Sequence, residues 1–239
     1  PEEGSPYSCL KEQIAFSLLA QKLFVEKIDV VIIADHHTIS GFGKLKYARN
    51  DYFTKNKAKL NASSYTILLG VEISCSERNH VVGIFDCSHE MEVEQFLKET
   101  IMSEIDGTYL SSLQILQMIK QRNGIGYLAH VNSSIDMGSS WSGAYNKKLF
   151  CEPALEMLGF TNLEKIDNVR HYINEQGCHR NFCVVHESDA HTIESTGKNN
   201  TWIKFSKIDF SGLKRAIADY SICIYPRRPV KSDKYIAGV

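Results

Sequence analysis

The stretch Val184–His191, Val-Val-His-Glu-Ser-Asp-Ala-His, predicts a buried β-strand that runs into a polar loop. Residues two apart in an extended segment project to the same side, so Asp189 and His191 can both reach one point at the carboxyl end of this strand. We expect the adjoining His186 and Glu187 to point away from that place. An isolated Asp-x-His pair is more often a loop hydrogen bond than a metal site, so its interpretation depends on the rest of the chain.

Three apolar runs earlier in the chain also deliver a carboxylate or an imidazole. Residues 28–34 lead into Asp35 and His36, residues 65–73 contain Glu72, and residues 125–130 end at His130. The carboxyl ends of parallel strands meet at one edge of a sheet, where α/β folds bind their ligands. His80 instead opens a further strand, predicted at 80–85.

The intervening segments complete an alternating pattern of strands and helices. We predict helices at 10–27, 42–60, 90–105, 108–121, 163–174 and 210–217, and further strands at 153–158, 181–185 and 202–205. The Ser- and Gly-rich segment 132–141 is a candidate lid. Such alternation indicates a parallel α/β sheet or barrel.

Composition indicates an ordinary globular chain. It has 239 residues, 43% of them hydrophobic, and a formal net charge of −1, which argues against a surface that binds polyanions by itself. The seven cysteines are scattered, with no Cys-x-x-Cys pair, and indicate reduced thiols. No apolar run approaches the roughly 20 residues of a membrane span, and the first residues are unlike a signal peptide, so we expect a cytoplasmic protein.

The converging side chains are of the types that Zn²⁺, Mn²⁺ and Fe²⁺ prefer. A closed site for one ion needs four ligands, so six or so imply more than one metal, and Glu72 is well suited to bridge two ions. Two alternatives stay open at this stage. Asp35 has a second interpretation as the cap of the following helix, and His80 has one as a capping or packing residue.

The series Ala34-Asp35-His36, Gly70-Val71-Glu72, His80-Val81-Val82-Gly83, Ala129-His130 and Ser188-Asp189-Ala190-His191 resembles the successive motifs of the PHP (polymerase and histidinol phosphatase) superfamily of metallo-phosphoesterases. This resemblance implies a distorted (β/α)7 barrel with up to three divalent metal ions, Mn, Zn or Fe. Glu72 would bridge two ions, His80 and His130 would complete the second, Asp189 would hold the first, and His36 and His191 would hold the third. The catalytic set would be His36, Glu72, His130, Asp189 and His191.

The sequence departs from the family at its beginning. PHP proteins open with a His-x-His pair on their first strand, and no such pair precedes His36. We therefore expect a barrel that lacks its first strand in this chain, or a reduced site.

The end of the chain resembles PHP modules that precede an SMC-like or AAA-type ATPase. We therefore expect a PHP-like domain over residues 1–225 and an exit segment over 226–239 that leads to such an ATPase domain. The expected function is hydrolysis of a phosphate ester by metal-activated water, with nucleic acid or a nucleotide favoured as substrate. Lys44, Lys46, Arg49 and Lys198 are candidates to hold the phosphate, although solvated surface residues are the simpler interpretation.

Two other functions remain open. One is a catalytically inactive PHP module that serves as a structural or regulatory domain of a larger ATPase. The other is a different barrel hydrolase of the amidohydrolase type, which would need a His-x-His strand and a carboxylated lysine that the sequence does not offer.

Overall fold

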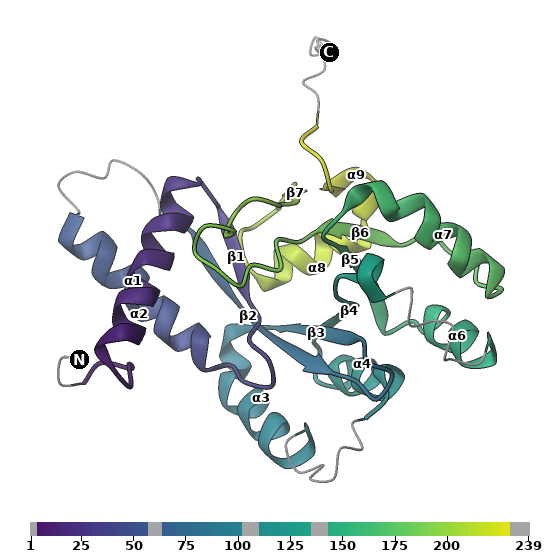
Figure 1. Cartoon of the computed structure of the whole chain (residues 1–239), viewed down its shortest axis with the longest axis horizontal. Helices are drawn as coiled ribbons and strands as arrows, with labels where there is room; N and C mark the ends of the chain where they lie inside the picture. The colour runs from purple at the N-terminus through teal and green to yellow at the C-terminus, as the bar shows by residue number, and fades with distance from the viewer. Residues whose placement is uncertain (1–3, 57–63, 102–109, 135–142, 230–239) are drawn as a thin grey trace.

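Six strands form one curled, mixed sheet that resembles half of a barrel (Figure 1). The computed structural model describes residues 4–56, 64–101, 110–134 and 143–229. The strands are hydrogen-bonded in chain order: β1 (Val30–Ile33), β2 (Thr66–Ser74), β3 (His80–Phe85), β4 (Ile125–Leu128), β5 (Leu155–Phe160) and β6 (Cys183–His186). The prediction of an α/β sheet is confirmed, whereas a closed seven-stranded barrel is not what the described residues form.

One strand runs against the others. β3 is antiparallel to both β2 and β4, while the other neighbouring pairs are parallel, so the prediction of an all-parallel sheet was wrong at this strand. The cause is the connection after β2. Ser74 pairs with His80, and the five residues between them suit a hairpin but are too few for a crossover. The first residue of β3 therefore lies at the same edge as the last residues of its neighbours.

The two faces of the sheet have separate cores. On β2, Ile67, Leu69, Val71 and Ile73 are buried in the outer core, while Leu68 on the opposite face belongs to the inner core. This alternation follows from the two-residue period of a strand. Glu72 lies four residues after Leu68 on the same strand, so its side chain projects from the same inner, concave face.

Helices cover the outer face. Figure 1 shows α1 (Leu10–Val25) and α2 (Ser40–Asn56) side by side at one end of the sheet. The remaining helices on this face are α3 (Glu90–Phe96), which continues as a π-helical turn (Leu97–Ile101), α4 (Ser112–Gln121), α6 (Gly143–Phe150) and α7 (Ile166–Glu175).

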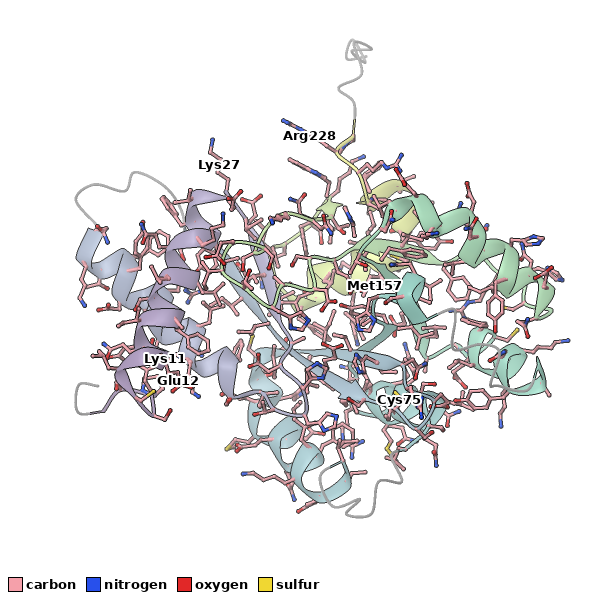
Figure 2. The ribbon with its side chains drawn as sticks, viewed as in Figure 1. Lys11, Glu12, Lys27, Cys75, Met157 and Arg228 are labelled. Atoms are coloured by element: carbon pink, nitrogen blue, oxygen red, sulfur yellow. The ribbon has the colours of Figure 1, made fainter. Side chains whose placement is uncertain are left out.

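The inner face packs against α8 (Phe210–Ala218). Phe210, Leu213, Ala216 and Ile217 of this helix form the inner core together with residues of the sheet. Met157 of β5 belongs to that core and lies in the interior, whereas Lys27 and Arg228 lie at the periphery (Figure 2). Burial of each large apolar side chain contributes roughly 1.5–3 kcal/mol, so α8 is a structural part of the half barrel.

Smaller elements complete the chain. They include two 3-10 helical turns (Cys87–His89 and Leu163–Lys165), α5 (Val131–Ser134), α9 (Tyr220–Cys223) and a two-stranded sheet of β7 (Trp202–Ile203) and β8 (Ile224–Tyr225). Thus the strand predicted at 202–205 is shorter than expected. No helix in the described part of the chain combines the length and apolar character that a membrane crossing requires.

Several predicted segments extend beyond the described residues. These are the helix ends at 57–60, 102–105 and 108–109, most of the candidate lid, and the exit segment from residue 230 onward.

Candidate metal centre

Glu72 is the centre of a polar cluster at the edge where β1, β2 and β4 end and β3 begins. Its side chain lies on the inner face, and the residue is only 9% exposed. Both backbone groups of Glu72 bond to the segment that follows β1, because Glu72 N–H donates to the Asp35 carbonyl (3.1 Å) and His37 N–H donates to the Glu72 carbonyl (2.8 Å). A buried carboxylate is costly unless it is paired or bound to a cation.

Three imidazoles converge on this carboxylate. Glu72 Oε1 lies 2.8 Å from His80 Nδ1 and 3.2 Å from His130 Nε2, and the two ring nitrogens are 2.9 Å apart. His36 Nε2 lies 3.9 Å from Oε2, the second oxygen of Glu72. One ligand atom from each of His36, Glu72 and His80 lies within 4.8 Å of the others. Four of the six predicted ligands are therefore gathered in one place.

The spacing of these atoms fits the donor set of a transition metal. Two atoms bound to one ion with bonds of about 2.1 Å are separated by roughly 3.0–3.4 Å at octahedral or tetrahedral angles. The Glu72, His80 and His130 atoms approach one another at about this spacing. Imidazole nitrogen with carboxylate oxygen is the combination that suits Zn²⁺, Mn²⁺ and Fe²⁺.

The electrostatics keep Glu72 ionised. Burial acts to raise the pKa of Glu72, but hydrogen bonds to His130 and His80 and the nearby His36 outweigh it and lower this pKa to about 2. The pKa of His130 is raised, chiefly by its hydrogen bond to Glu72 and against the effect of burial, with the charges of Glu187 and Asp189 adding to the shift. The cluster therefore offers a carboxylate anion to any bound cation.

Asp189 and His191 pair with each other. Their Oδ1 and Nε2 atoms are 3.3 Å apart, which confirms that the two side chains reach one point. The expected extended backbone is wrong, because Asp189 has a φ of 44°, in the left-handed region, and the chain turns there. Neither residue belongs to the group formed by His36, Glu72 and His80 in the described structure, and their role as ligands stays a prediction.

Asp35 caps a helix, as the alternative interpretation predicts. Its carboxylate accepts the backbone N–H of Gly41 in the first turn of α2. Burial raises the pKa of Asp35, and this hydrogen bond opposes the rise. The neighbouring His37 uses Nε2 to accept the backbone N–H of Ser74 at 2.9 Å, so this ring supports β2.

Glu187 is a residue of this region that was not predicted from the sequence. This carboxylate accepts the backbone N–H of His130 and the hydroxyl of Tyr127, the latter at 3.1 Å. The expectation that it points away from the site was wrong. Glu187 lies four residues after Cys183 of the inner core and two before Asp189, so strand alternation places its side chain on the inner face. This even spacing could have predicted its position from the sequence. Burial raises the pKa of Glu187 to about 7, although its hydrogen bond from His130 opposes the shift.

Three of the four candidate phosphate-binding cations, Lys44, Lys46 and Arg49, have structural partners. Lys44 Nζ lies 2.5 Å from Glu12 Oε1 and joins α2 to α1. Arg49 donates to the Tyr65 carbonyl at 3.1 Å, and Lys46 Nζ lies over the Phe42 ring. These contacts favour the simpler interpretation of Lys44, Lys46 and Arg49 as residues of a helix surface.

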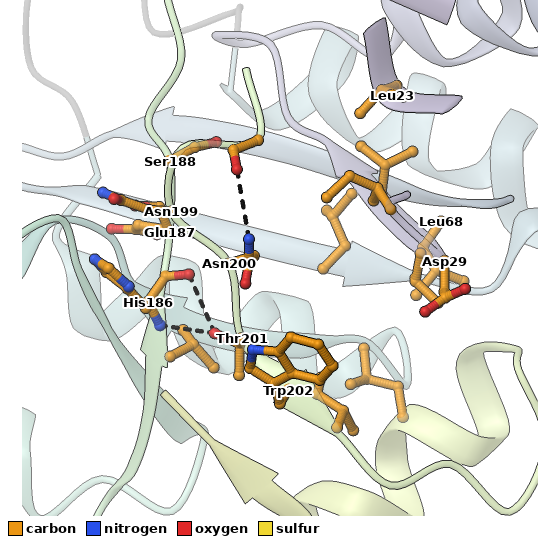
Figure 3. A pocket seen from close by; sticks show the side chains of 18 of the residues that line it. Leu23, Asp29, Leu68, His186, Glu187, Ser188, Asn199, Asn200, Thr201 and Trp202 are labelled. Carbon is orange, nitrogen blue, oxygen red and sulfur yellow. Dashed lines mark hydrogen bonds between the residues drawn. The ribbon is translucent and has the colours of Figure 1, made fainter. Parts of the chain in front are cut away.

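A cleft of about 770 Å³ lies between β1 and the segment that leads from His186 to Ile203 (Figure 3). Leu68 and Asp29 face it from one side. Across the cleft, His186 N–H donates to Thr201 Oγ1 at 2.7 Å, and the Thr201 hydroxyl donates to the His186 carbonyl at 3.1 Å, so this segment covers the end of β6. The cleft is lined in part by Glu187, whereas His36, Glu72, His80 and His130 are not among the described residues that line it.

The cleft exposes the outer edge of β1. The Asp29 carbonyl accepts from Thr66 N–H of β2. Because the direction of the backbone hydrogen bonds alternates along a strand, Val31 and Ile33 also bond to β2. The backbone groups of Val30 and Ile32 therefore face the cleft. No described segment pairs with that edge. Ile32 is 36% exposed there.

Comparison with known proteins gives one sequence relative and a set of similar structures. No protein-family model matches the chain. An uncharacterized protein of Streptococcus pneumoniae serotype 4 is 38% identical over 146 residues, which are 60% of this chain and 56% of that protein. The chain thus matches little more than half the length of this relative.

Among solved structures, the novel lesion-specific endonuclease Q from Pyrococcus furiosus superposes with a TM-score of 0.58 and 13% identity, over 90% of this chain and 53% of that protein. The chain shares the fold of about half of endonuclease Q. A complex of endonuclease Q with a 27-mer duplex that has an abasic lesion at the active site gives a TM-score of 0.54 and 14% identity, over 90% of this chain and 54% of that protein. At these identities the likeness to endonuclease Q concerns the fold.

Proposed function

We propose that the protein is a metal-dependent phosphoesterase that hydrolyses phosphodiester bonds in nucleic acid. The observation that carries this proposal is the convergence of His36, Glu72 and His80 within 4.8 Å, with His130 hydrogen-bonded to Glu72. The order of the motifs, which resembles that of the PHP superfamily, supports the same chemistry.

The proposed metal ligands are His36, Glu72, His80 and His130, with Asp189 and His191 joining them from the loop after β6. A bound divalent ion would supply Lewis-acid polarisation of the phosphoryl group and lower the pKa of a water molecule. For this, the ring nitrogens that face Glu72 must be unprotonated, and Glu72 must be anionic. Glu72 is anionic in the metal-free cluster, and a bound cation would take the place of the ring N–H groups as its partner.

Nucleic acid is the proposed substrate class. Endonuclease Q, of which the chain shares the fold of about half, is a lesion-specific endonuclease that was captured with a 27-mer duplex substrate. With a net charge of −1, however, the chain offers little general attraction for a polyanion, so we expect affinity to come from the metal site or from a partner.

We propose further that one more strand pairs with the edge of β1 and completes the seven-stranded barrel. This closure is supported by the backbone groups of Val30 and Ile32, with which no described segment pairs, and by the cleft beside them with its apolar lining. The division into a domain over 1–225 and an exit segment over 226–239 that leads to an ATPase also remains a proposal.

The function is tested with the purified chain, both alone and extended by its native upstream residues where they exist. Metal content after dialysis against Mn²⁺, and hydrolysis of a generic phosphodiester, are compared with those of the His80→Ala variant. We expect His80→Ala to lower hydrolysis by more than the roughly 100-fold that loss of a supporting residue costs, because it removes a ligand.

His171→Ala is the matched control, since His171 is exposed on α7 and pairs only with Glu175 among the contacts described. It should behave as wild type. If neither form of the wild-type protein retains metal or cleaves the substrate, the proposal is wrong. The same side chains would then form the hydrogen-bonded core of an inactive module.

A further inference from the structure

Glu187 is held rigidly at the end of β6. Its backbone N–H donates to the Phe160 carbonyl of β5 at 3.0 Å, and its carbonyl accepts from Asn199 Nδ2 at 3.1 Å. The backbone is therefore fixed on both sides. From there the side chain extends across β5 toward β4.

The carboxylate reaches β4 because residue 159 is a glycine. A Cβ atom at Gly159 would lie 2.4 Å from Glu187 Oε2, closer than side-chain atoms approach one another. With that space open, one oxygen accepts the Tyr127 hydroxyl and the other accepts the His130 backbone N–H. Three neighbouring strands thus contribute to one contact.

That contact stabilises a strained residue. His130 has a φ of 31°, which is uncommon for a residue with a side chain, and it directly follows β4. A hydrogen bond from a backbone N–H to a carboxylate is stronger than one between neutral groups. The direction of the His130 ring, 3.2 Å from Glu72 and 2.9 Å from His80, depends on this backbone conformation.

We infer that Glu187 is a positioning residue that fixes the His130 imidazole against Glu72 by holding the His130 backbone across Gly159. The inference rests on the proposed function for its consequence, which is tighter metal binding. Glu187 itself does not touch Glu72, His36 or His80 in the contacts described.

The test compares Glu187→Ala, Glu187→Gln and Gly159→Ala with wild type. The dissociation constant of Mn²⁺ is measured by calorimetry, and the His130 backbone amide is followed by ¹H–¹⁵N NMR without metal. We expect Glu187→Ala to weaken Mn²⁺ binding by about 10- to 100-fold and to move the His130 amide proton upfield. Glu187→Gln should recover part of both effects, since its amide oxygen can still accept the His130 N–H.

Gly159→Ala changes no polar group but displaces the Glu187 carboxylate. It should therefore reproduce the upfield shift of the His130 amide proton, even if Glu187→Ala folds poorly. Glu156→Gln is the matched control. Glu156 lies on the same strand as Gly159, and its carboxylate pairs with Lys120 at 2.6 Å, outside the cluster. This control should leave the amide shift and the Mn²⁺ affinity unchanged.

The two readouts separate the inference from the function. If wild type binds Mn²⁺ and the His130 amide does not respond to Glu187→Ala or Gly159→Ala, the inference is wrong while the proposed function stands. If wild type binds no Mn²⁺ but both variants shift the amide, the positioning role is supported and the proposed function fails.

Discussion

Gly41 and Gly43 are two residues apart in α2 and have different surroundings. A Cβ at Gly41 would lie 2.0 Å from Asp35 Oδ2, whereas a Cβ at Gly43 would have no neighbour within 4 Å. We expect Gly41→Ala to break the cap that Asp35 forms and to lower the free energy of unfolding by about 1–2 kcal/mol. Gly43→Ala should raise it by about 0.5–1 kcal/mol through helix propensity. Urea unfolding of both variants checks this, and changes of the same sign would contradict it.

At the same scale, the sequence predicted Glu72, His80 and His130 because each lies beside an apolar run. The PHP resemblance further implied that these three side chains share one ion, and they do lie together in the structure. The approach of Glu187 to His130 depends on a glycine in a third strand, and nothing in the local pattern of either residue specifies that gap. The sequence allows Asp35 to be a cap or a ligand, and its contact with Gly41 supports the cap.

The direction of β3 was predictable from the length of its connection to β2, although the hydrophobic pattern of the strand carries no such information. A run such as His80–Phe85 has the same period in either direction. The five-residue hairpin provides the missing constraint. It also explains how His80, at the beginning of its strand, meets Glu72 near the end of β2.

The contact between α1 and α2 gives a prediction about acid stability. The pKa of Glu12 is lowered from 4.5 to about 2, first by the hydrogen bond from Lys44 and then by those from Ser8. A carboxylate with a depressed pKa stabilises the fold above its unfolded-state pKa, and this contribution disappears as the pH falls from about 4.5 toward 2. Wild type should therefore exceed Glu12→Gln in melting temperature at pH 6, and the difference should shrink at pH 3.

The control for this experiment is Glu94→Gln, which removes an exposed ion pair with Lys98 within one helix. Such pairs contribute little, so its difference from wild type should be small at both pH values. If the difference in melting temperature between wild type and Glu12→Gln grows from pH 6 to pH 3, the assigned direction of the Glu12 pKa shift is wrong.

On the scale of the whole molecule, the candidate ligands come from segments beside β1, β2, β3 and β4, so a bound ion would connect most of the half barrel. An ion that binds only the folded chain stabilises it by about 2.7 kcal/mol at 100 times its dissociation constant. For a chain of this size, that corresponds to roughly 5–10 °C in melting temperature.

We therefore expect Mn²⁺ to raise the melting temperature of wild type and a chelator to return it to the metal-free value. His80→Ala should show little response, and His171→Ala should respond as wild type does. An equal shift in all three proteins would indicate binding elsewhere.

The outer edge of β1, with which no strand in the described part of the chain pairs, also bears on how the molecule behaves in concentrated solution. A free strand edge with apolar residues is a template on which another chain can add its own strand. Val30 and Ile32 present such an edge beside an open cleft. A segment that occupied it would shield the chain from self-association, so closure of the barrel would act against aggregation independently of any catalytic role.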